Sequence, residues 1–499
     1  MMPSQMANPE ADGTPVVGPG SELIAWFITA VGIWFMVCTF RMLSTMRPDL
    51  KAGIFSYAHA GFGKLVGFLV AWGYWIFNTV SCAAYGMLVM GTLHYFFPQV
   101  FISPNGNTLV SIVCASAANW FMVYLANRGA KESAALNIVG TIGKTIPIIT
   151  FIVVCALLFN PQVFTSDFWA LQANAATSAA VSTAAHGVAN IAPPATALQG
   201  TPSFASIASQ VGPCTMVTLW VFLGIEGAVV ASGEAKSQKD VSRATLFGFL
   251  VTLCIYLLVS LLPFGLYSPG DLGSFQSPSM GTILADAFGP GALVFINLGI
   301  IVSVLSSWLV WVVLCTQMPY FAAREDLLPA SLANENSHGA PTKALIYTGV
   351  VTQIALVLSL FVSGNVWDMI TNTISAMAAP CYLFCALFLL KIALLDREWR
   401  NTETAHMHRK RALIVGLCAI AFSIFLILAG NTHYILIACF LYAIGIPFLL
   451  YTRYKRAGSL AVLRDDFYPA EWAAMGIVVL LGIIGICSIC CGLSAGLCL

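Results

Sequence analysis

The chain has 499 residues, of which 59% are hydrophobic and only 9% are charged, and its formal net charge at pH 7 is +1. Soluble domains typically carry about 25% charged residues, so this composition excludes a soluble protein built around one large core. The small net charge gives no indication of partners and no support for nucleic-acid binding.

Apolar runs long enough to cross a lipid bilayer recur from one end of the chain to the other. They predict an all-α polytopic membrane protein with twelve spans. The predicted spans are 21–44, 64–97, 107–127, 134–159, 213–233, 242–268, 290–322, 343–363, 367–393, 411–429, 433–452 and 472–497. The second and seventh are long enough to imply strong tilt or an extension into water.

Basic residues occupy every second connection between these spans. In the odd-numbered connections and at their flanks lie Arg41, Arg47, Lys51, Lys64, Arg128, Lys131, Lys236, Lys239, Arg243, Arg324, Lys343, Lys391, Arg397, Arg400, Arg409, Lys410, Arg411, Arg453, Lys455, Arg456 and Arg464. Of the 22 Lys and Arg residues, only Lys144 lies elsewhere. Because cytoplasmic loops are enriched in Lys and Arg, we expect these connections to be cytoplasmic, in a bacterial inner membrane.

This orientation divides the chain into three parts. Residues 1–20 form an external N-terminal segment, 21–393 form the core, and 394–499 form C-terminal helices. The external segment has no signal that would carry it across, so we expect an inside-to-outside helix upstream of Met1. A true N-outside protein and a wrongly assigned start codon are the alternatives. Within the core, 160–212 is an external low-complexity insertion, and it receives no function.

Acidic residues gather on the opposite, external side. They are Glu10, Asp12, Glu22, Asp167, Asp271, Asp286 and Asp368. An acidic vestibule would concentrate cations there. The alternative is that acidic residues simply escape the bias that holds basic residues inside.

Two ionisable residues are predicted to lie at mid-depth in the membrane. Glu226 stands in "FLGIEGAVV", about 13 residues or roughly 20 Å into its span, and Lys144 lies roughly 16 Å into the fourth span. Unpaired, each costs several kcal/mol, so each is a functional candidate; the alternative is a buried structural ion pair. The glycines beside Glu226 weaken the helix, which favours a discontinuous helix of the kind that forms transporter binding sites.

Three stretches resemble one family. "TLWVFLGIEGAVVASGEAKSQKDVSRAT" resembles the sixth-helix signature of the basic amino acid/polyamine antiporters, in the amino acid–polyamine–organocation superfamily. "WLVWVVLCTQMPYFAAREDLLPASLANENSHGAPTKALI" resembles their eighth helix and following loop, and "MRPDLKAGIFSYAHAGFGKLVGFLVAWGYWIFN" resembles their second-to-third connection. The similarity covers nearly the whole chain apart from 160–212, and is nearest to arginine/ornithine and arginine/agmatine exchangers.

The resemblance implies a five-plus-five inverted repeat with broken first and sixth helices. The twelve spans then correspond to family helices two to thirteen. Family helix one, with its "GxIGxGIF" segment, would precede "MMPSQMA", and it normally supplies half of the backbone site for the substrate. A transport-inactive remnant that lacks helix one is therefore one alternative.

The resemblance also assigns substrate-binding and gating residues. The unwound sixth-helix segment comprises Gly224, Ile225, Glu226, Gly227 and Ala228. Trp220 and Trp311 match aromatics near the substrate path, and an indole face attracts a guanidinium group by about 0.5–2 kcal/mol. Either tryptophan, taken alone, is also consistent with ordinary packing.

Three further positions carry over from the family. Tyr85 matches a third-helix position of the arginine/ornithine branch, and Cys82 replaces a common asparagine, which leaves the substrate open. Lys144 matches a fifth-helix lysine whose ammonium stands in for a sodium ion, which implies sodium independence. Apart from the resemblance, desolvation favours the neutral form of a lysine, so we expect a proton-linked role for Lys144.

The leading hypothesis is an antiporter of cationic amino acids, such as arginine, ornithine and lysine, or of amine products such as agmatine. A neutral amino acid transporter is the alternative within the superfamily. The scattered histidines form no HExxH motif or other catalytic set, so no enzyme is expected. We expect no cofactor, no metal and no nucleic acid; the partners are small substrates and the lipid bilayer, with a homodimer as the one assembly considered.

Overall fold

The computed structural model describes residues 2–9, 15–50, 53–103, 107–176, 202–224, 227, 238–275, 279–361, 366–400 and 408–497. Twelve of its helices are long and apolar enough to cross a membrane, which confirms the predicted all-α architecture with twelve spans. These are α2 (Pro19–Met46), α3 (Ile54–Phe96), α4 (Leu109–Asn127), α5 (Ala130–Leu157), α8 (Phe204–Phe222), α10 (Gln238–Leu261), α13 (Gly291–Arg324), α14 (Thr342–Leu358), α15 (Val366–Leu394), α17 (Arg409–Ala429), α18 (Thr432–Ala457) and α20 (Pro469–Leu497).

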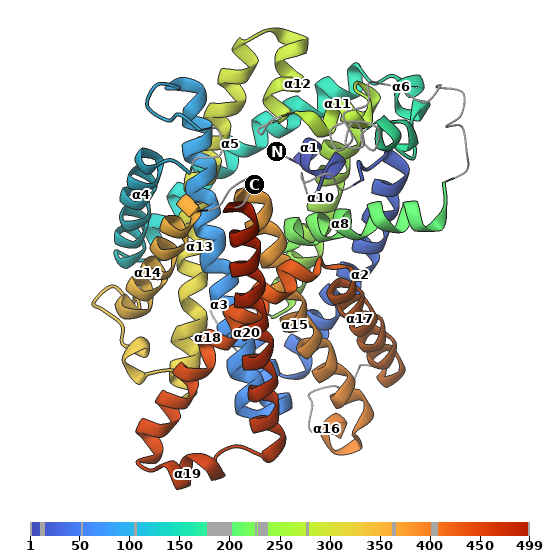
Figure 1. Cartoon of the computed structure of the whole chain (residues 1–499). Helices are drawn as coiled ribbons and strands as arrows, with labels where there is room; N and C mark the ends of the chain where they lie inside the picture. The colour runs from blue at the N-terminus through green and yellow to red at the C-terminus, as the bar shows by residue number, and fades with distance from the viewer. Residues whose placement is uncertain are drawn as a thin grey trace.

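Short helices lie in the connections. They are α1 (Met2–Ala7), α6 (Pro161–Ser166), η3 (Leu262–Gly265), α11 (Pro269–Ser274), α12 (Ser279–Phe288), η4 (Ala330–Ala333), η5 (Ser359–Phe361), α16 (Asp396–Arg400) and α19 (Leu460–Asp465). In Figure 1, α6, α11 and α12 lie at one end of the molecule and α16 and α19 at the other.

The long helices form because their backbone groups have no water to bind in a bilayer and must bond within the helix. Local signals set several of the ends. Thr108 accepts a hydrogen bond from Ser111 N and starts α4, and Ser203 accepts one from Ser206 N and starts α8. Gly458 ends α18 in a left-handed conformation with φ 72°, which glycine adopts at no steric cost.

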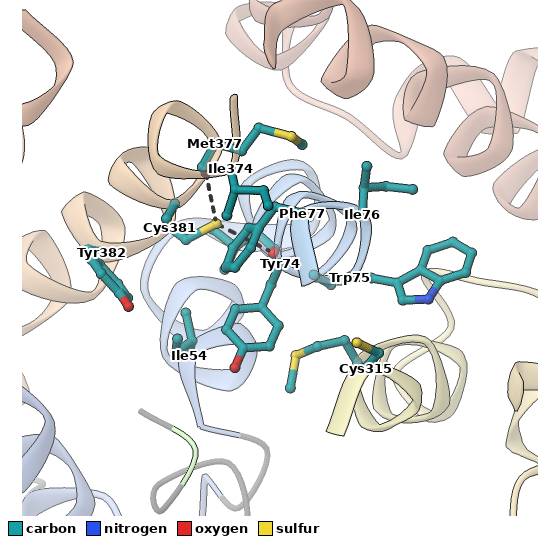
Figure 2. Packing of buried hydrophobic residues seen from close by; sticks show 14 of the residues in the cluster. Ile54, Tyr74, Trp75, Ile76, Phe77, Cys315, Ile374, Met377, Cys381 and Tyr382 are labelled. Carbon is teal, nitrogen blue, oxygen red and sulfur yellow. Dashed lines mark hydrogen bonds between the residues drawn. The ribbon is translucent and has the colours of Figure 1, made fainter. Parts of the chain in front are cut away.

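Helix α3 is the centre of the packing, and it contacts α15, α13, α14, α18 and α4. Figure 2 shows aromatic and aliphatic side chains of α3 lying between α15 and α13. The labelled residues there include Tyr74, Trp75, Ile76 and Phe77 of α3, Ile374, Met377 and Cys381 of α15, and Cys315 of α13. The C-terminal helices α18 and α20 run side by side against this centre (Figure 1).

Helix α3 is interrupted near its start. Gly63 has φ 85° and ψ −168°, outside the helical region, so residues 54–62 form a separate helical piece. An L-residue with a side chain is strained at such a φ, which explains the glycine. The predicted second span, 64–97, begins directly after this break.

The described parts of the N-terminal segment, 2–9 and 15–20, pack against the rest of the protein. Met6 and Ala7 of α1 are fully buried, and Val17 N donates to Ala7 O at 2.8 Å. Part of the low-complexity insertion closes over them: Gly20 N donates to Phe168 O at 2.9 Å, and Asn174 Nδ2 donates to Val16 O at 2.9 Å. The middle of the insertion, 177–201, lies outside the described residues.

Candidate functional site

The sixth predicted family helix is broken where the sequence analysis expects a break. Helix α8 ends at Phe222, Leu223 has an extended ψ of 131°, and Gly224 has φ 103°. Gly227 N then donates to Gly224 O at 2.8 Å, which makes a tight turn. Glycine is required at such a φ because a Cβ would clash with the backbone. Ile225, Glu226 and Ala228 lie outside the described residues, so their roles stay predictions.

The indole of Trp311 lies against this break. A Cβ placed on Gly224 would lie 3.0 Å from Trp311 Cζ2 and 3.1 Å from Cη2, closer than ordinary contacts. A Cβ on Gly227 would lie 3.9 Å from Leu314 Cδ1. One turn of α13 therefore covers the break. Of the site residues predicted from the sequence, the structure brings Gly224, Gly227 and Trp311 together.

A cavity of about 340 Å³ opens between the end of α8 and α10. It is lined by Val221, Phe222, Leu223, Gly224, Ala244, Thr245, Gly248, Phe249, Thr252 and Tyr256. Because α8 has ended by Leu223, backbone groups of the break face this space together with three hydroxyl side chains. That combination of apolar walls and a few polar groups is typical of small-molecule sites.

Cys82 and Tyr85 lie on α3 beside this region. Cys82 is fully buried and its thiol hydrogen-bonds that of Cys315 on α13. Half-buried Tyr85 lies one turn further along α3, near both thiols and near Tyr256, which lines the cavity. Cys315 carries no sequence signal of its own, since a cysteine in an apolar helix reads as a small hydrophobe.

Trp220 and Lys144 are not among the residues that line the cavity. Trp220 is half-buried, packs against the main core, and is not part of the cavity lining. Lys144 is half-buried on α5, which packs closely against α13 through glycines: a Cβ on Gly143 would lie 2.8 Å from Val302. Lys144 forms no ion pair within the described ranges, and its pairing with Glu226 stays a prediction because Glu226 is outside them.

Glu22 differs from the expectation that it lies on an acidic external face. Its side chain is fully buried. Trp26 Nε1 donates to Glu22 Oε1 at 3.1 Å and to Ser260 Oγ at 2.9 Å, while Glu22 Oε2 has no hydrogen-bond partner in the part of the protein that the structure describes. Placement in a water-exposed vestibule is therefore wrong for this residue.

Aromatic rings connect Glu22 to the cavity. Trp26 stacks on Tyr256 with ring centroids 6.4 Å apart and meets Phe222 edge-on at 6.1 Å, and both of these rings line the cavity. The carboxyl thus lies one aromatic layer behind the cavity wall. The spacing of Glu22 and Trp26, four residues apart on one helix face, was the available signal in the sequence.

Comparison with known proteins gives a consistent assignment. The family model for amino acid permeases matches residues 6–448. A protein of Clostridium perfringens (strain 13 / Type A), named as a candidate amino-acid transporter, is 39% identical over 94% of this chain and 91% of its own length. The arginine/agmatine antiporter of Chlamydia pneumoniae is 36% identical over 94% of this chain and 90% of its own length.

Among solved structures, a substrate-bound, outward-open Na⁺-coupled sialic acid symporter aligns with 87% of this chain and 89% of its own, at a TM-score of 0.43 and 12% identity. A likeness of that size carries no argument about substrate or ion coupling. The family model and the curated relatives confirm the predicted superfamily, and they are transporters rather than enzymes. The chain therefore belongs to the amino acid permease family and is a multi-pass membrane protein of amino acid transport.

Proposed function

We propose that the chain is an antiporter of cationic amino acids, exchanging arginine, ornithine or lysine for one another or for an amine product such as agmatine. Exchange occurs by alternating access, in which the helices that carry the break rock against the remaining helices. The exchange takes place across a bacterial inner membrane, and the odd-numbered connections lie on its cytoplasmic side.

The observation that carries this proposal is the contact between the indole of Trp311 and Gly224 at the end of α8. Backbone N–H and C=O groups released by the break suit the carboxylate and amino groups that all amino acids share. The indole face suits the cationic end of the side chain, because it attracts guanidinium and ammonium groups. The backbone at the break and the indole face of Trp311 therefore lie directly beside each other.

The choice of cationic cargo rests on relatives as well as on geometry. Antiporters named for arginine and agmatine are 36% and 37% identical to this chain over 94% and 86% of its length. A neutral amino acid transporter is the second candidate, and Cys82 favours it, because a thiol hydrogen-bonds a polar substrate weakly.

Counterflow in proteoliposomes tests the proposal. Liposomes that contain the protein are loaded with arginine, ornithine, lysine or agmatine, and entry of labelled arginine is followed over time. We expect entry only when a countersubstrate is inside. Trp311→Leu and Glu226→Gln should each reduce it strongly, whereas Trp120→Leu, at a 40%-exposed tryptophan of α4, should not.

Other outcomes are equally informative. Entry of labelled neutral amino acids without entry of arginine would establish the alternative cargo. Entry of arginine without any countersubstrate would replace exchange with uniport. Absence of entry for every amino acid and amine tested, in protein that melts cooperatively, would contradict the proposal and leave a transport-inactive chain.

A further inference from the structure

A second, larger cavity lies away from the candidate substrate site, between α2 and the first turns of α17. Its volume is about 740 Å³. The residues that line it are Trp34, Phe35, Cys38, His408, Arg409, Lys410, Arg411, Ile414 and Val415. Apolar and aromatic side chains thus form one part of the wall, and a histidine with three consecutive basic residues forms the other.

Helices α2 and α17 run antiparallel along this cavity, so the order of residues in each helix gives their relative positions along the cavity. A Cβ on Gly32 would overlap the ring of Phe422, and further along the pair Cys38 and Val415 line the cavity together. Arg41 and Arg411 both act electrostatically on the Cys38 thiol. The basic residues of both helices therefore lie at one level, at the end of the cavity where α17 begins.

Apolar side chains lie deeper along the same helices. Trp34 is 40% exposed and Ile414 is 59% exposed, one to two turns from the basic level. Both helices are candidate membrane spans. A transition from basic to apolar side chains, with a tryptophan beside it, is the pattern found where a helix passes from lipid headgroups into acyl chains.

The cationic charge at this level is not neutralised within the described residues. Arg409 holds the chain in place: it binds Asp396 and donates to Leu394 O at 2.7 Å. Lys410 and Arg411 are exposed and form no ion pair with a residue that the structure describes. Asp49, which follows α2 in the chain, is bound by Arg47 at 2.7 Å. Among the residues that the structure describes, a net positive charge therefore remains at Lys410 and Arg411.

We propose that this cavity binds an anionic phospholipid. Lys410 and Arg411 hold the phosphate of the headgroup, and the acyl chains lie along Trp34 and Ile414. The phosphate supplies the missing negative charge, and the chains cover apolar surface that a soluble anion would leave exposed. Basic pockets between membrane helices on the cytoplasmic side are suited to such headgroups. The proposal does not depend on which amino acid is transported.

Native mass spectrometry of the purified full chain with added lipid tests this. Phosphatidylglycerol or cardiolipin is titrated in, with phosphatidylcholine as the neutral comparison. We expect retention of the anionic lipid, and the double variant Lys410→Gln/Arg411→Gln should bind it about 30-fold more weakly. Lys455→Gln/Arg464→Gln removes the same charge from exposed positions of the described structure and should leave binding unchanged.

Two further measurements distinguish lost lipid binding from misfolding, and a bound lipid from bound inorganic phosphate. Trp34→Ala should weaken retention of long-chain lipid while leaving the melting temperature in neutral detergent near that of the parent, which distinguishes lost binding from misfolding. Millimolar inorganic phosphate should not displace the lipid. Equal loss of lipid in both double variants, retention of phosphatidylcholine as strong as that of the anionic lipids, or complete displacement by inorganic phosphate would each overturn the proposal.

Discussion

Gly224 shows how one residue couples backbone geometry to a side chain on another helix. Its φ of 103° is open to glycine and costs other residues about 1–2 kcal/mol, and a Cβ there would lie only 3.0 Å from the Trp311 ring, which would have to move by a few tenths of an ångström. The backbone break after α8 and the position of the indole therefore both depend on Gly224, and a substitution there should change both.

Gly224→Ala tests that constraint. We expect the alanine to displace the indole of Trp311 and to lower counterflow at least tenfold, with a loss of about 1–3 kcal/mol in folding free energy. Initial rates in proteoliposomes and a melting curve measure the two effects. The matched control is Gly476→Ala in α20, where a Cβ would meet nothing within 4 Å. Counterflow by Gly224→Ala at the rate of the control would contradict the role of the break.

Glu22 is a second residue whose behaviour follows from its surroundings. It lies in a membrane-spanning helix, fully buried, with Trp26 as the donor to one oxygen. A carboxylate without a cation beside it is costly in such a site, whereas a neutral group of the same shape is tolerated. Glu22→Gln should therefore stay within about 1 kcal/mol of the parent protein.

Glu22→Ala should behave differently, because it removes one of the two acceptors of Trp26 and leaves a cavity. We expect it to cost about 2–4 kcal/mol, seen as a lower melting temperature. Glu335→Ala, at an exposed glutamate, is the comparison and should cost less than about 1 kcal/mol. A destabilisation by Glu22→Gln as large as that by Glu22→Ala would show that the negative charge itself is required.

At the scale of helices, Asp466 joins segments that are far apart in the sequence. It accepts hydrogen bonds from Lys64, just after the break in α3, and from Arg453 of α18, whose Nη2 lies 2.7 Å from Oδ1. Only 16% of the Asp466 side chain is exposed. Burial raises the pKa of Asp466, but the hydrogen bonds from Arg453 and Lys64 and their charges outweigh it and hold the pKa below its usual range.

The sign of the pH effect follows from that lowered pKa. Stability from Asp466 is fully present above the ordinary carboxyl pKa of about 4 and is lost as the pH falls through the lowered value. Asp466→Asn should thus cost about 1–2 kcal/mol at neutral pH and progressively less in acid. Melting curves from pH 7 to pH 3 measure the difference. Asp49→Asn, at a 59%-exposed side chain paired with Arg47, should show a smaller effect, and a pH-independent cost for Asp466→Asn would contradict the ion-pair explanation.

The elements differ in how far the sequence determines them. The twelve long helices follow from apolar runs, because a bilayer leaves the backbone few alternatives. The break after Phe222 is visible in the glycine pattern. The contact between Lys64 and Asp466 is not, since these residues are 402 positions apart in the chain. The burial of Glu22 was missed for the same reason: it depends on the packing of α2 against α8 and against α10, which places Ser260 beside Trp26.

At the scale of the whole molecule, the short helices at the two ends of the helical bundle differ in their basic residues. Helices α16 and α19 lie at one end and carry Arg397, Arg400 and Arg464 together with acidic neighbours, whereas α6, α11 and α12 lie at the other end and carry no Lys or Arg (Figure 1). The arrangement is consistent with the alternation of basic connections along the chain. Because the cytoplasmic loops of membrane proteins are enriched in Lys and Arg, we expect the end that carries α16 and α19 to face the cytoplasm.

Cysteine labelling in intact cells tests this orientation. Asp271→Cys in α11 and Lys455→Cys in α18 replace exposed residues at opposite ends of the bundle. A membrane-impermeant maleimide should label the first in intact cells and the second only after permeabilisation. The parent protein, labelled in the same way, is the control for its native cysteines. Of the cysteines whose side chains the structure describes, the exposed Cys254 and Cys487 lie within candidate spans, where such a reagent does not reach them. Labelling of Lys455→Cys but not Asp271→Cys in intact cells would invert the orientation, and with it the assignment of the phospholipid cavity to the cytoplasmic leaflet.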